Sequence, residues 1–470
     1  MIHIYYIEWK IDPMRRENEF RYSKLANILR EQILSGYIKP GEYLLSENEL
    51  CKHYGMSRTS VRKSLDQLLK DRLIVKKVGQ GTIVSPDLVV PVSERKVLRV
   101  LATSPSHFAD SCMQTLIDAF QQKYSHVDVK FMSFPTLDFW ESIRASSEMG
   151  LQPDVIFAGD RQCLESGLSD DDFLDLQEPL EQSLQAMYPR MAGAFRQGEA
   201  IIAAPVTFST VYLAYNPQLF EAYGIEKPGP HWTRDEFVAA ARRLTVDTDG
   251  DGIVDQYGFS LNSAFNRWPV IALQNGVKFD GNEDKEPLVR TLTFIHDLLF
   301  RYRIAVNSAK FLRNSDAFVR GKTGMVLTTS IELAGWRNEQ LEFEPQVAPL
   351  PFGEEKGTLL IANAFMIPSR CSDPELAVEF VRTALGPDLQ ESIGRSSQFV
   401  SVLREVNERL WDKETLESLN IRDERIENGH FLFEMIPDSN RVEELDSALG
   451  LFWAGLEAAE AAAERLRSLR

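Results

Sequence analysis

The side chains best suited to chemistry near the N-terminus are cations on one exposed face of a predicted helix. This face carries Arg58, Thr59, Arg62 and Lys63. An arginine at the start of such a helix can donate two parallel hydrogen bonds to a guanine edge in the major groove. Lys76 and Lys77 follow in a predicted hairpin, where lysines can meet phosphate groups. These residues together predict a surface that binds duplex DNA.

Two short helices and a turn must hold that face in place. Residues 22–38 have apolar side chains at helical spacing, which predicts that they form a helix before the two short helices. Ser46 and Glu49 form a capping box that begins the next helix, and residues 54–56 make a tight turn after it. Ser57 then caps the helix that carries the cations. Two short helices joined by a glycine-containing turn predict a helix-turn-helix.

A basic β-hairpin is predicted directly after the second of these helices. Two strand-like stretches, residues 74–78 and 82–85, flank the turn Gly79-Gln80-Gly81. The bare glycine tip suits close approach to a minor groove. The alternative is a helical subdomain whose arginines only solvate a surface. The capping residues, the turn and the hairpin all agree with one fold, which favours the DNA-binding interpretation.

The charge of the chain is divided unevenly along its length. The 470 residues have a formal net charge of -17, yet residues 15–86 hold 14 Lys or Arg against 8 Asp or Glu. A basic head on an acidic body is expected when only the head touches nucleic acid. The four cysteines lie far apart without a CxxC pair, which indicates a reducing compartment and no disulfide framework.

The N-terminal segment resembles the winged helix-turn-helix of GntR-family regulators. The resemblance is carried by residues 33–85, ILSGYIKPGEYLLSENELCKHYGMSRTSVRKSLDQLLKDRLIVKKVGQGTIVS. It implies that Arg58 and Arg62 reach DNA from the recognition helix and that the hairpin is the wing, with its first glycine at the tip. The chain departs from the family at two positions. Leu45 stands where the family usually has proline, and Asn48 stands where it often has a DNA-contacting arginine.

Strand-like and helix-like stretches alternate from Val97 through most of the remaining chain. This alternation predicts an α/β sheet with crossover connections. We therefore expect a DNA-binding head over residues 14–86, a linker over 87–96 and an α/β body over 97–470. No run of about 18 apolar residues is present, so no membrane span is expected.

The body resembles the family 1 extracellular solute-binding proteins, which are the sugar-binding components of ABC importers. The matching segments follow the family's order: YNPQLFEAYGIEKPGPHWTRDEFVAAARRL, DTDGDGIVDQYGF, FVRGKTGMVLTTS, VAPLPFG, and LLIANAFMIP followed by DPELAVEFVRTAL. The resemblance implies a type II periplasmic-binding-protein-like fold. In that fold two α/β lobes are joined by crossing segments, and the ligand lies in the cleft. Closure of the lobes on a ligand is a hinge motion.

Candidate ligand residues follow from what a sugar needs and from where such clefts form. A sugar needs aromatic platforms for its apolar faces and polar side chains for its hydroxyls. Binding-protein clefts are lined by loops at the carboxyl ends of strands. The residues that meet these criteria are Ser104, His107, Trp140, Asp160, Phe208, Ser209, Trp268, Ser330, Trp336 and Asn363. Each has an alternative role, since a tryptophan can pack in the core and a serine or asparagine can cap a loop.

The aspartate spacing in the loop DTDGDGIVDQYG partly matches that of a calcium-binding loop. Its Asp247, Asp249, Asp251 and Asp255 fall at positions one, three, five and nine of a calcium-binding loop. Gly258 stands at position twelve, where a bidentate glutamate is needed. The alternative, an Asx and glycine turn between a helix and a strand, is therefore favoured. We expect no metal and no cofactor, because the sequence has no histidine pair and no cofactor motif.

These inferences predict a cytoplasmic transcription regulator, and not an enzyme, whose operator binding is controlled by a sugar or oligosaccharide. One alternative is a ligand that is not a carbohydrate. Another is an aminotransferase-like body with pyridoxal phosphate, although the body lacks that family's order of motifs. A transport receptor would need a signal peptide, and the N-terminal pattern lacks one whether the chain starts at Met1 or Met14.

The expected partners are an operator duplex and a second copy of the chain, with no membrane. Helix-turn-helix proteins usually bind paired half-sites as dimers. A C-terminal apolar stripe could join two copies or pack on its own lobe. It consists of Leu449, Phe452, Trp453 and Leu456. The sequence leaves open the identity of the ligand, the operator, and whether the regulator activates or represses.

Overall fold

The structure is a computed structural model of the chain. It describes residues 25–30, 32–34, 38, 40–53, 56–77, 81–88, 96–135, 139–148, 152–163, 172–229, 231–263, 265–279, 284–308, 315–336, 341–355, 357–397, 399–422 and 426–469. In these ranges, no helix is both long and apolar enough to cross a membrane. The chain divides into two compact units: residues 1–99, 124–130 and 137–153 form one, and residues 100–123, 131–136 and 154–470 form the other.

The N-terminal head is a small helical domain with a two-stranded wing. Its elements are helical residues 25–30 and 32–34, α2 (Glu47–His53), α3 (Arg58–Lys70), β1 (Ile74–Lys77) and β2 (Gly81–Val84). The strands are antiparallel, with Ile74 opposite Val84 and Lys77 opposite Gly81. The core includes Leu25, Leu29, Ile33, Leu50, Val61, Leu65 and Leu68. The predicted helix-turn-helix and hairpin are thus confirmed, while Gly79 at the predicted tip lies outside the described residues.

The first lobe of the body is built on one mixed sheet with strand order β15-β8-β14-β5-β3-β4, and β16 pairs with β14. Its strands are β3 (Lys96–Ser104), β4 (Val127–Pro135), β5 (Val155–Gly159), β8 (Ala204–Thr210), β14 (Thr358–Met366), β15 (Val400–Ser401) and β16 (Gly429–Phe431). The hairpin β6 (Arg196–Gln197) and β7 (Ala200–Ile201) is separate from this sheet. Because β3 begins at Lys96, residues 89–95 of the predicted linker are the part that lies outside the described residues.

Helices of this part of the chain precede and follow the strands. They are α4 (His107–Lys123), α5 (Phe139–Glu148), α6 (Asp160–Cys163), α7 (Glu181–Ala186), α8 (Pro189–Ala192), α15 (Pro374–Ala384), α16 (Pro387–Ser397), α17 (Arg404–Leu410) and α18 (Lys413–Ser418). The parallel pair β3 and β5 frames the first of these helices, α4. This is the crossover pattern that the alternation of strands and helices predicts.

The second lobe has a five-stranded sheet of order β11-β10-β12-β9-β13. Its strands are β9 (Tyr212–Tyr215), β10 (Tyr257–Asn262), β11 (Ala305–Ser308), β12 (Thr323–Thr328) and β13 (Gln346–Ala348). Its helices are α9 (Pro217–Ala222), α10 (Arg234–Arg243), α11 (Pro269–Gln274), α12 (Lys285–His296), the π-helix η2 (Asp297–Arg301), α13 (Asp316–Val319), α14 (Ser330–Trp336), α21 (Ser439–Ala448), α22 (Gly450–Trp453) and α23 (Ala459–Ser468). Leu449 and Phe452 of the C-terminal stripe are buried in the core of this lobe, whereas Leu456 is 76% exposed.

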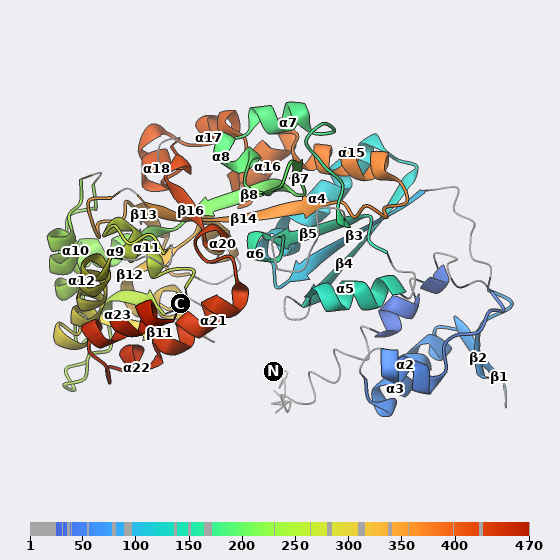
Figure 1. The fold of residues 1–470 in the computed structure, drawn as a ribbon, viewed down its shortest axis with the longest axis horizontal. Coiled ribbons are helices and arrows are strands. Elements are labelled where there is room, and N and C mark those ends of the chain that lie inside the picture. The colour runs from blue at the N-terminus through green and yellow to red at the C-terminus, as the bar shows by residue number, and fades with distance from the viewer. Residues whose placement is uncertain are drawn as a thin grey trace, which may run out of the picture. The chain divides into compact units, whose positions relative to one another are not determined.

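Three segments cross between the lobes. The strand β8 continues through Val211 into β9, β14 returns to the first lobe, and β16 leads through α20 (Leu432–Met435) to α21. Figure 1 shows the long strands β8 and β14 side by side in the first lobe. The Val211 N–H donates to the Leu359 carbonyl at 2.9 Å, and the Thr358 hydroxyl donates to the Val211 carbonyl at 2.8 Å. These bonds tie two crossing segments together where the lobes meet.

Candidate DNA-binding and ligand-binding sites

The helix α3 has one face exposed to solvent and the opposite face buried in the head. Ser57 caps its start, where the Ser60 N–H donates to the Ser57 Oγ at 3.2 Å. Val61 and Leu65 lie in the core of the head. The exposed side carries Arg58, Thr59, Arg62 and Lys63. The structure therefore brings together on one face the four helix residues that the sequence predicts to bind DNA.

Glu47 on α2 orders the two arginines of this face. Its Oε2 lies 2.8 Å from the Nε of Arg62 and 3.9 Å from the Nε of Arg58. The hydrogen bond that the Arg62 Nε donates to this carboxylate raises the pKa of the Arg62 guanidinium. An acidic group within a cationic face directs the arginines and opposes indiscriminate attraction to phosphates. Sequence reasoning missed Glu47, because its partners lie on another helix and no spacing along one helix reveals them.

The wing strand β1 presents Lys76 and Lys77 to solvent. The Lys76 Nζ lies 3.7 Å from an Asp66 carboxylate oxygen on α3, which links the wing to the recognition helix. Asn48, at the position where related regulators often have arginine, is exposed on α2. The contact of Gly79 with a minor groove stays a prediction.

A pocket of about 160 Å³ lies between the two lobes. It is lined by Asp160, Arg161, Asn266, Leu359, Leu360, Ile361, Leu432, Phe433, Ile436, Pro437 and Val442. These residues come from α6 in the first lobe, the segment before α11 in the second lobe, and the crossing elements β14 and α20. Among the described residues that line it, Asp160 is the one predicted from the sequence as a ligand residue. The polar groups Asp160, Arg161 and Asn266 face a mostly apolar wall.

Asp160 is the acidic group of this pocket. Burial raises the pKa of its carboxyl to about 7, although hydrogen bonds from the Arg161 and Ala362 backbone partly oppose the shift. The Arg161 N–H donates to its Oδ1 at 2.9 Å. Asn363 pairs in register with Gly159, and its Nδ2 is buried without a partner in the described part of the chain. Two predicted residues therefore lie near the end of β5: the Asp160 carboxylate, which can accept a hydrogen bond, and the Asn363 amide opposite Gly159, which can donate one.

Direct hydrogen bonds join the lobes beside the hinge. The Ser330 N–H at the start of α14 donates to the Ser209 Oγ at 2.7 Å, and the Ser330 Oγ lies 3.3 Å from the Phe208 carbonyl oxygen to which it donates. His107 at the start of α4 lies so close to Gly335 that a Cβ on this glycine would overlap its ring. The structure thus brings four of the predicted residues, His107, Phe208, Ser209 and Ser330, to the contact between the lobes.

A buried ion pair in the second lobe was not predicted. The Arg267 Nη2 lies 3.1 Å from a Glu332 carboxylate oxygen, and the two side chains are 6% and 14% exposed. Hydroxyls of Ser315 and Thr328 donate to the same carboxylate at 2.7 and 3.0 Å. In the described ranges, the Arg267 Nε and the Tyr212 hydroxyl are buried without partners. The sequence offered one signal: Arg267 is next to the predicted ligand residue Trp268, and Glu332 is two residues after the predicted ligand residue Ser330.

Two of the three tryptophans predicted as aromatic platforms pack in the core. Trp268 is fully buried, with its ring centroid 5.9 Å from that of Trp453. Trp336 is 6% exposed and packs against Phe318 with centroids 5.3 Å apart. Trp140 is half-buried on α5. For Trp268 and Trp336 the structure therefore gives the core packing that the sequence leaves as the alternative.

The aspartate loop forms hydrogen-bonded turns. One carboxylate oxygen from each of Asp247, Asp249 and Asp255 lies within 4.8 Å of the others. The Gly250 and Gly252 N–H groups both donate to Asp247 at 2.7 Å, and the bond from Gly252 contributes most to lowering the pKa of that aspartate. These contacts are those of the favoured Asx and glycine turn. A calcium role for the loop stays the less favoured alternative.

The head is similar to curated bacterial repressors. Over 68 residues it is 38% identical to the mannosyl-D-glycerate transport/metabolism system repressor MngR of Escherichia coli (strain K12), which covers 14% of this chain and 28% of that protein. Over 94 residues it is 32% identical to the arabinose metabolism transcriptional repressor of Halalkalibacterium halodurans, which covers 19% of this chain and 25% of that protein. The chain thus spans about a quarter of the length of these relatives.

The body is similar to solved structures of binding proteins. The GacH receptor of Streptomyces glaucescens GLA.O, solved unliganded and with acarbose, aligns with a TM-score of 0.66 and 18% identity over 80% of this chain and 97% of that chain. The ABC substrate-binding protein Lmo0181 from Listeria monocytogenes, in complex with cycloalternan, aligns with a TM-score of 0.65 and 16% identity over the same shares of the two chains. At this identity the likeness establishes the two-lobed fold.

Two family models match the chain without overlapping. The model of bacterial regulatory proteins of the gntR family matches residues 21–84. The model of bacterial extracellular solute-binding proteins matches residues 109–391, which is more than half of the chain. Both resemblances read from the sequence are thereby confirmed. The chain belongs to the bacterial extracellular solute-binding protein family and carries a GntR-family regulatory domain as its N-terminal head.

Proposed function

We propose that the chain is a transcription regulator whose affinity for a DNA operator is controlled by a sugar or oligosaccharide held between its lobes. The observation that carries the proposal is the presence in one chain of an exposed cationic helix in a GntR-family head and a pocket between two lobes that carries Asp160, Arg161 and Asn266. Such a fusion can act as a switch because a ligand that favours the closed body changes DNA binding whenever closure and DNA binding are coupled.

The head supplies the DNA-binding half of this function. Arg58 and Arg62 would contact base edges from α3, which gives sequence specificity. Lys63, Lys76 and Lys77 would contact phosphates, which gives affinity that falls with salt. Two heads on a dimer would read the paired half-sites of an operator. The curated relatives of the head are repressors, which supports a regulatory role for this head.

The polar groups around the cleft support a ligand rich in hydroxyl groups. Asp160 on the pocket wall can accept a hydrogen bond from a hydroxyl, and Asn266 can donate one. The Asn363 Nδ2, on the strand β14 that also lines the pocket, is a buried donor without a partner in the described part of the chain. A ligand that satisfies buried donors removes a free-energy penalty and so gains affinity. The names of the relatives also favour a carbohydrate, since the two repressors concern mannosyl-D-glycerate and arabinose, and the two similar structures bind acarbose and cycloalternan.

A smaller solute that is not a carbohydrate is the second candidate ligand. The pocket measures about 160 Å³, and most of its lining residues are apolar. A protein of similar fold, UgpB from Mycobacterium tuberculosis, has been solved with glycerophosphocholine, at a TM-score of 0.63 and 14% identity over 78% of this chain and 96% of that chain. A solute of this kind would use the same pocket and the same mechanism of control.

The proposed mechanism works by binding alone. The body requires no catalytic step and no cofactor, because lobe closure itself carries the signal. The regulator would act in the cytoplasm, where the operator is, and as a homodimer on DNA. The head is proposed over residues 14–86 and the sensor over residues 97–470.

Two measurements on the purified full chain test the proposal. The first is a thermal-shift screen of sugars, oligosaccharides and phosphodiesters, since a ligand of the folded state raises the melting temperature. The second is fluorescence anisotropy with duplexes from the region upstream of its gene, against scrambled duplexes. We expect a carbohydrate that stabilises the chain and a duplex that is preferred over its scrambled control. Equal binding to every duplex at low salt would contradict the regulator, and stabilisation only by a phosphodiester would replace the sugar with the second candidate.

A further inference from the structure

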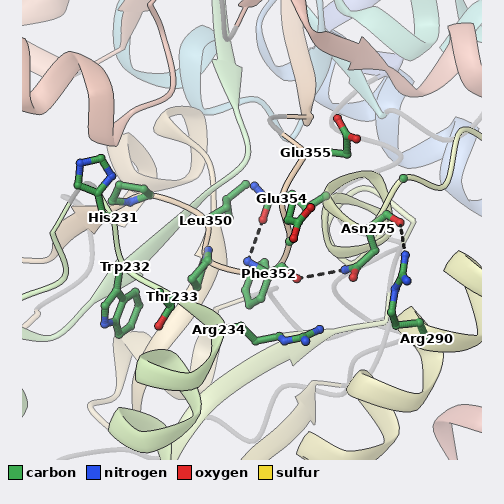
Figure 2. A pocket seen from close by; sticks show the side chains of 15 residues that line it. His231, Trp232, Thr233, Arg234, Asn275, Arg290, Leu350, Phe352, Glu354 and Glu355 are labelled. Carbon is green, nitrogen blue, oxygen red and sulfur yellow. Dashed lines mark hydrogen bonds between the residues drawn. The ribbon is translucent and has the colours of Figure 1, made fainter.

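A second cavity, of about 610 Å³, lies within the second lobe and shares no lining residue with the interlobe pocket. Its wall is formed by residues 231–234 at the start of α10, residues 274–276 at the end of α11, Arg290 on α12 and residues 349–355 after β13. Figure 2 shows the cavity with these side chains. Its volume falls within the range of about 300–1,000 Å³ that is typical of ligand pockets.

Opposite charges line different sides of this cavity. Arg234 and Arg290 lie in the lower part of Figure 2, and Glu354 and Glu355 lie in the upper part, on the loop after β13. All four residues are exposed, and in the described part of the chain no ion pair joins any of them to another residue. Charges that are held apart in one cavity suit a ligand that itself bears both signs of charge.

The two arginines are held by contacts that leave their charge available. The Arg290 Nη2 donates to the Asn275 carbonyl at 3.1 Å. The Arg234 guanidinium lies 5.3 Å from the centroid of the Phe294 ring. A carbonyl and a ring face orient a guanidinium without neutralising it, so each arginine can still bind a carboxylate.

The floor of the cavity is fixed by contact between a loop and a helix end. The Phe352 N–H donates to the Gln274 Oε1 at 2.9 Å, and the Asn275 Nδ2 donates to the Phe352 carbonyl at 3.2 Å. Gly353 packs so closely here that a Cβ would overlap the Gln274 carbonyl oxygen. Trp232 packs edge-on against Phe237 with ring centroids 5.8 Å apart, and it also lines the cavity. A wall fixed in this way loses little conformational freedom when a ligand binds.

We propose that this cavity is a second ligand site, and that its ligand is a small zwitterion with a carboxylate and an ammonium group, as in a free amino acid or short peptide. The carboxylate accepts hydrogen bonds from Arg234 and Arg290. The ammonium group donates to Glu354 and Glu355. The apolar part of the ligand lies against Trp232.

The helix α11 connects this site to the interlobe pocket. The N-cap of α11 is Trp268, two residues after Asn266 of the interlobe pocket, and its last residue, Gln274, lines the second cavity. The loop that carries Glu355 leads into β14, which crosses between the lobes from Thr358 onward. A zwitterion that fixes this loop against α11 therefore biases lobe closure, and each ligand changes the affinity of the other by the same factor. This coupling rests on the proposed function, whereas the binding of the zwitterion does not.

Calorimetric titration of the full chain with the common L-amino acids and a set of dipeptides tests the site. We expect at least one of them to bind with one-to-one stoichiometry. Its N-acetylated and C-amidated forms, which each lack one charge, should bind at least about tenfold more weakly. Arg234→Gln and Glu354→Gln should each weaken binding about tenfold. The matched controls Arg370→Gln and Glu443→Gln, at exposed positions outside the cavity, should bind as the natural chain does.

Three results would overturn this proposal. Failure of every zwitterion to bind at about 10 mM removes the site. A zwitterion whose affinity is the same for Arg234→Gln, Glu354→Gln and the natural chain binds at a site other than this cavity. A binder that tolerates N-acetylation is not recognised as a zwitterion. Coupling is tested by repeating a sugar titration with the zwitterion at saturation, and an unchanged sugar Kd overturns the coupling. Failure of every sugar contradicts the proposed function instead, and the amino-acid titration still decides the second site.

Discussion

The backbone N–H of Ser330 donates a 2.7 Å hydrogen bond to the hydroxyl of Ser209, and this bond joins the second lobe to the first. Both residues are buried at the base of the cleft, one at the start of α14 and the other on the crossing strand β8. We infer that this bond forms when the lobes close and so stabilises the closed body.

Replacing this acceptor should weaken ligand binding. Ser209→Ala leaves the buried Ser330 N–H without its partner in the closed state, which costs about 1–3 kcal/mol. We expect the Kd of the cleft ligand, measured by calorimetry, to rise by a factor of about 5 to 150. Ser468→Ala, an exposed serine on α23, serves as the control and should change nothing. Equal affinities of the two variants would remove the role of this bond.

A methyl group at Gly335 should hold the lobes apart. The added Cβ of Gly335→Ala would overlap the His107 ring across the contact between α14 and α4. We expect a larger radius of gyration by small-angle X-ray scattering and a higher Kd for the cleft ligand. The double variant Gly335→Ala with His107→Ala has room for the methyl group and should regain the compact form. An unchanged radius for Gly335→Ala would show that the lobes do not close on this contact.

The carboxyl of Asp160 should make stability depend on pH. Burial raises its pKa from 3.8 to about 7, so the folded state holds this proton more tightly than the unfolded state. The resulting stabilisation is present below about pH 4 and is lost as the pH rises through about 7. Asp160→Asn has no titratable group at this position. The melting temperature of the variant minus that of the natural chain should therefore increase as the pH rises from about 4 to about 7. Asp87→Asn, at an exposed position, is the control, and its melting temperature should change with pH as that of the natural chain does.

Removing an arginine from the recognition face should weaken specific DNA binding. Arg62→Ala would remove the proposed base contact, which is worth about 1–3 kcal/mol, and so should raise the operator Kd by about 5- to 150-fold. The melting shift caused by the cleft ligand should stay the same, because α3 takes no part in the body. Arg370→Ala provides the control for loss of one positive charge. An operator affinity that matches this control would refute the assignment of α3.

Breaking the buried ion pair should destabilise the second lobe. Glu332→Gln leaves the Arg267 charge, on a side chain that is 6% exposed, without its counterion. A cost of about 3–5 kcal/mol is expected, measured by chemical denaturation. The double variant Arg267→Met with Glu332→Gln removes both charges and should recover much of that loss. A double variant less stable than Glu332→Gln would contradict this view of the pair.

The head could be predicted from the sequence in detail because its determinants are local. The Ser46 N–H donates to Glu49 at 2.8 Å, and the Ser57 Oγ accepts from the Ser60 N–H at 3.2 Å, as the capping patterns predict. The α/β character of the body followed from the alternation of elements, and its two-lobed architecture followed from the family resemblance. These features depend on spacing along the chain, which a sequence displays directly.

The side-chain partnerships across elements could not be predicted in the same way. Glu47 and Arg62 stand 15 residues apart, and Arg267 and Glu332 stand 65 apart, so no helical or strand period connects them. The interlobe pocket likewise takes much of its wall from α20, far along the chain from Asp160. The burial of Trp268 had the same origin, because its packing partner Trp453 comes from a C-terminal helix.

The central claim is that a ligand in the cleft changes the affinity of the head for its operator. The most direct measurement is the operator Kd of the full chain by fluorescence anisotropy, with and without a saturating ligand identified by thermal shift. Coupling of this kind predicts a change of about 5- to 150-fold in that Kd, in either direction. A ligand that stabilises the chain and leaves the operator Kd unchanged would contradict the claim.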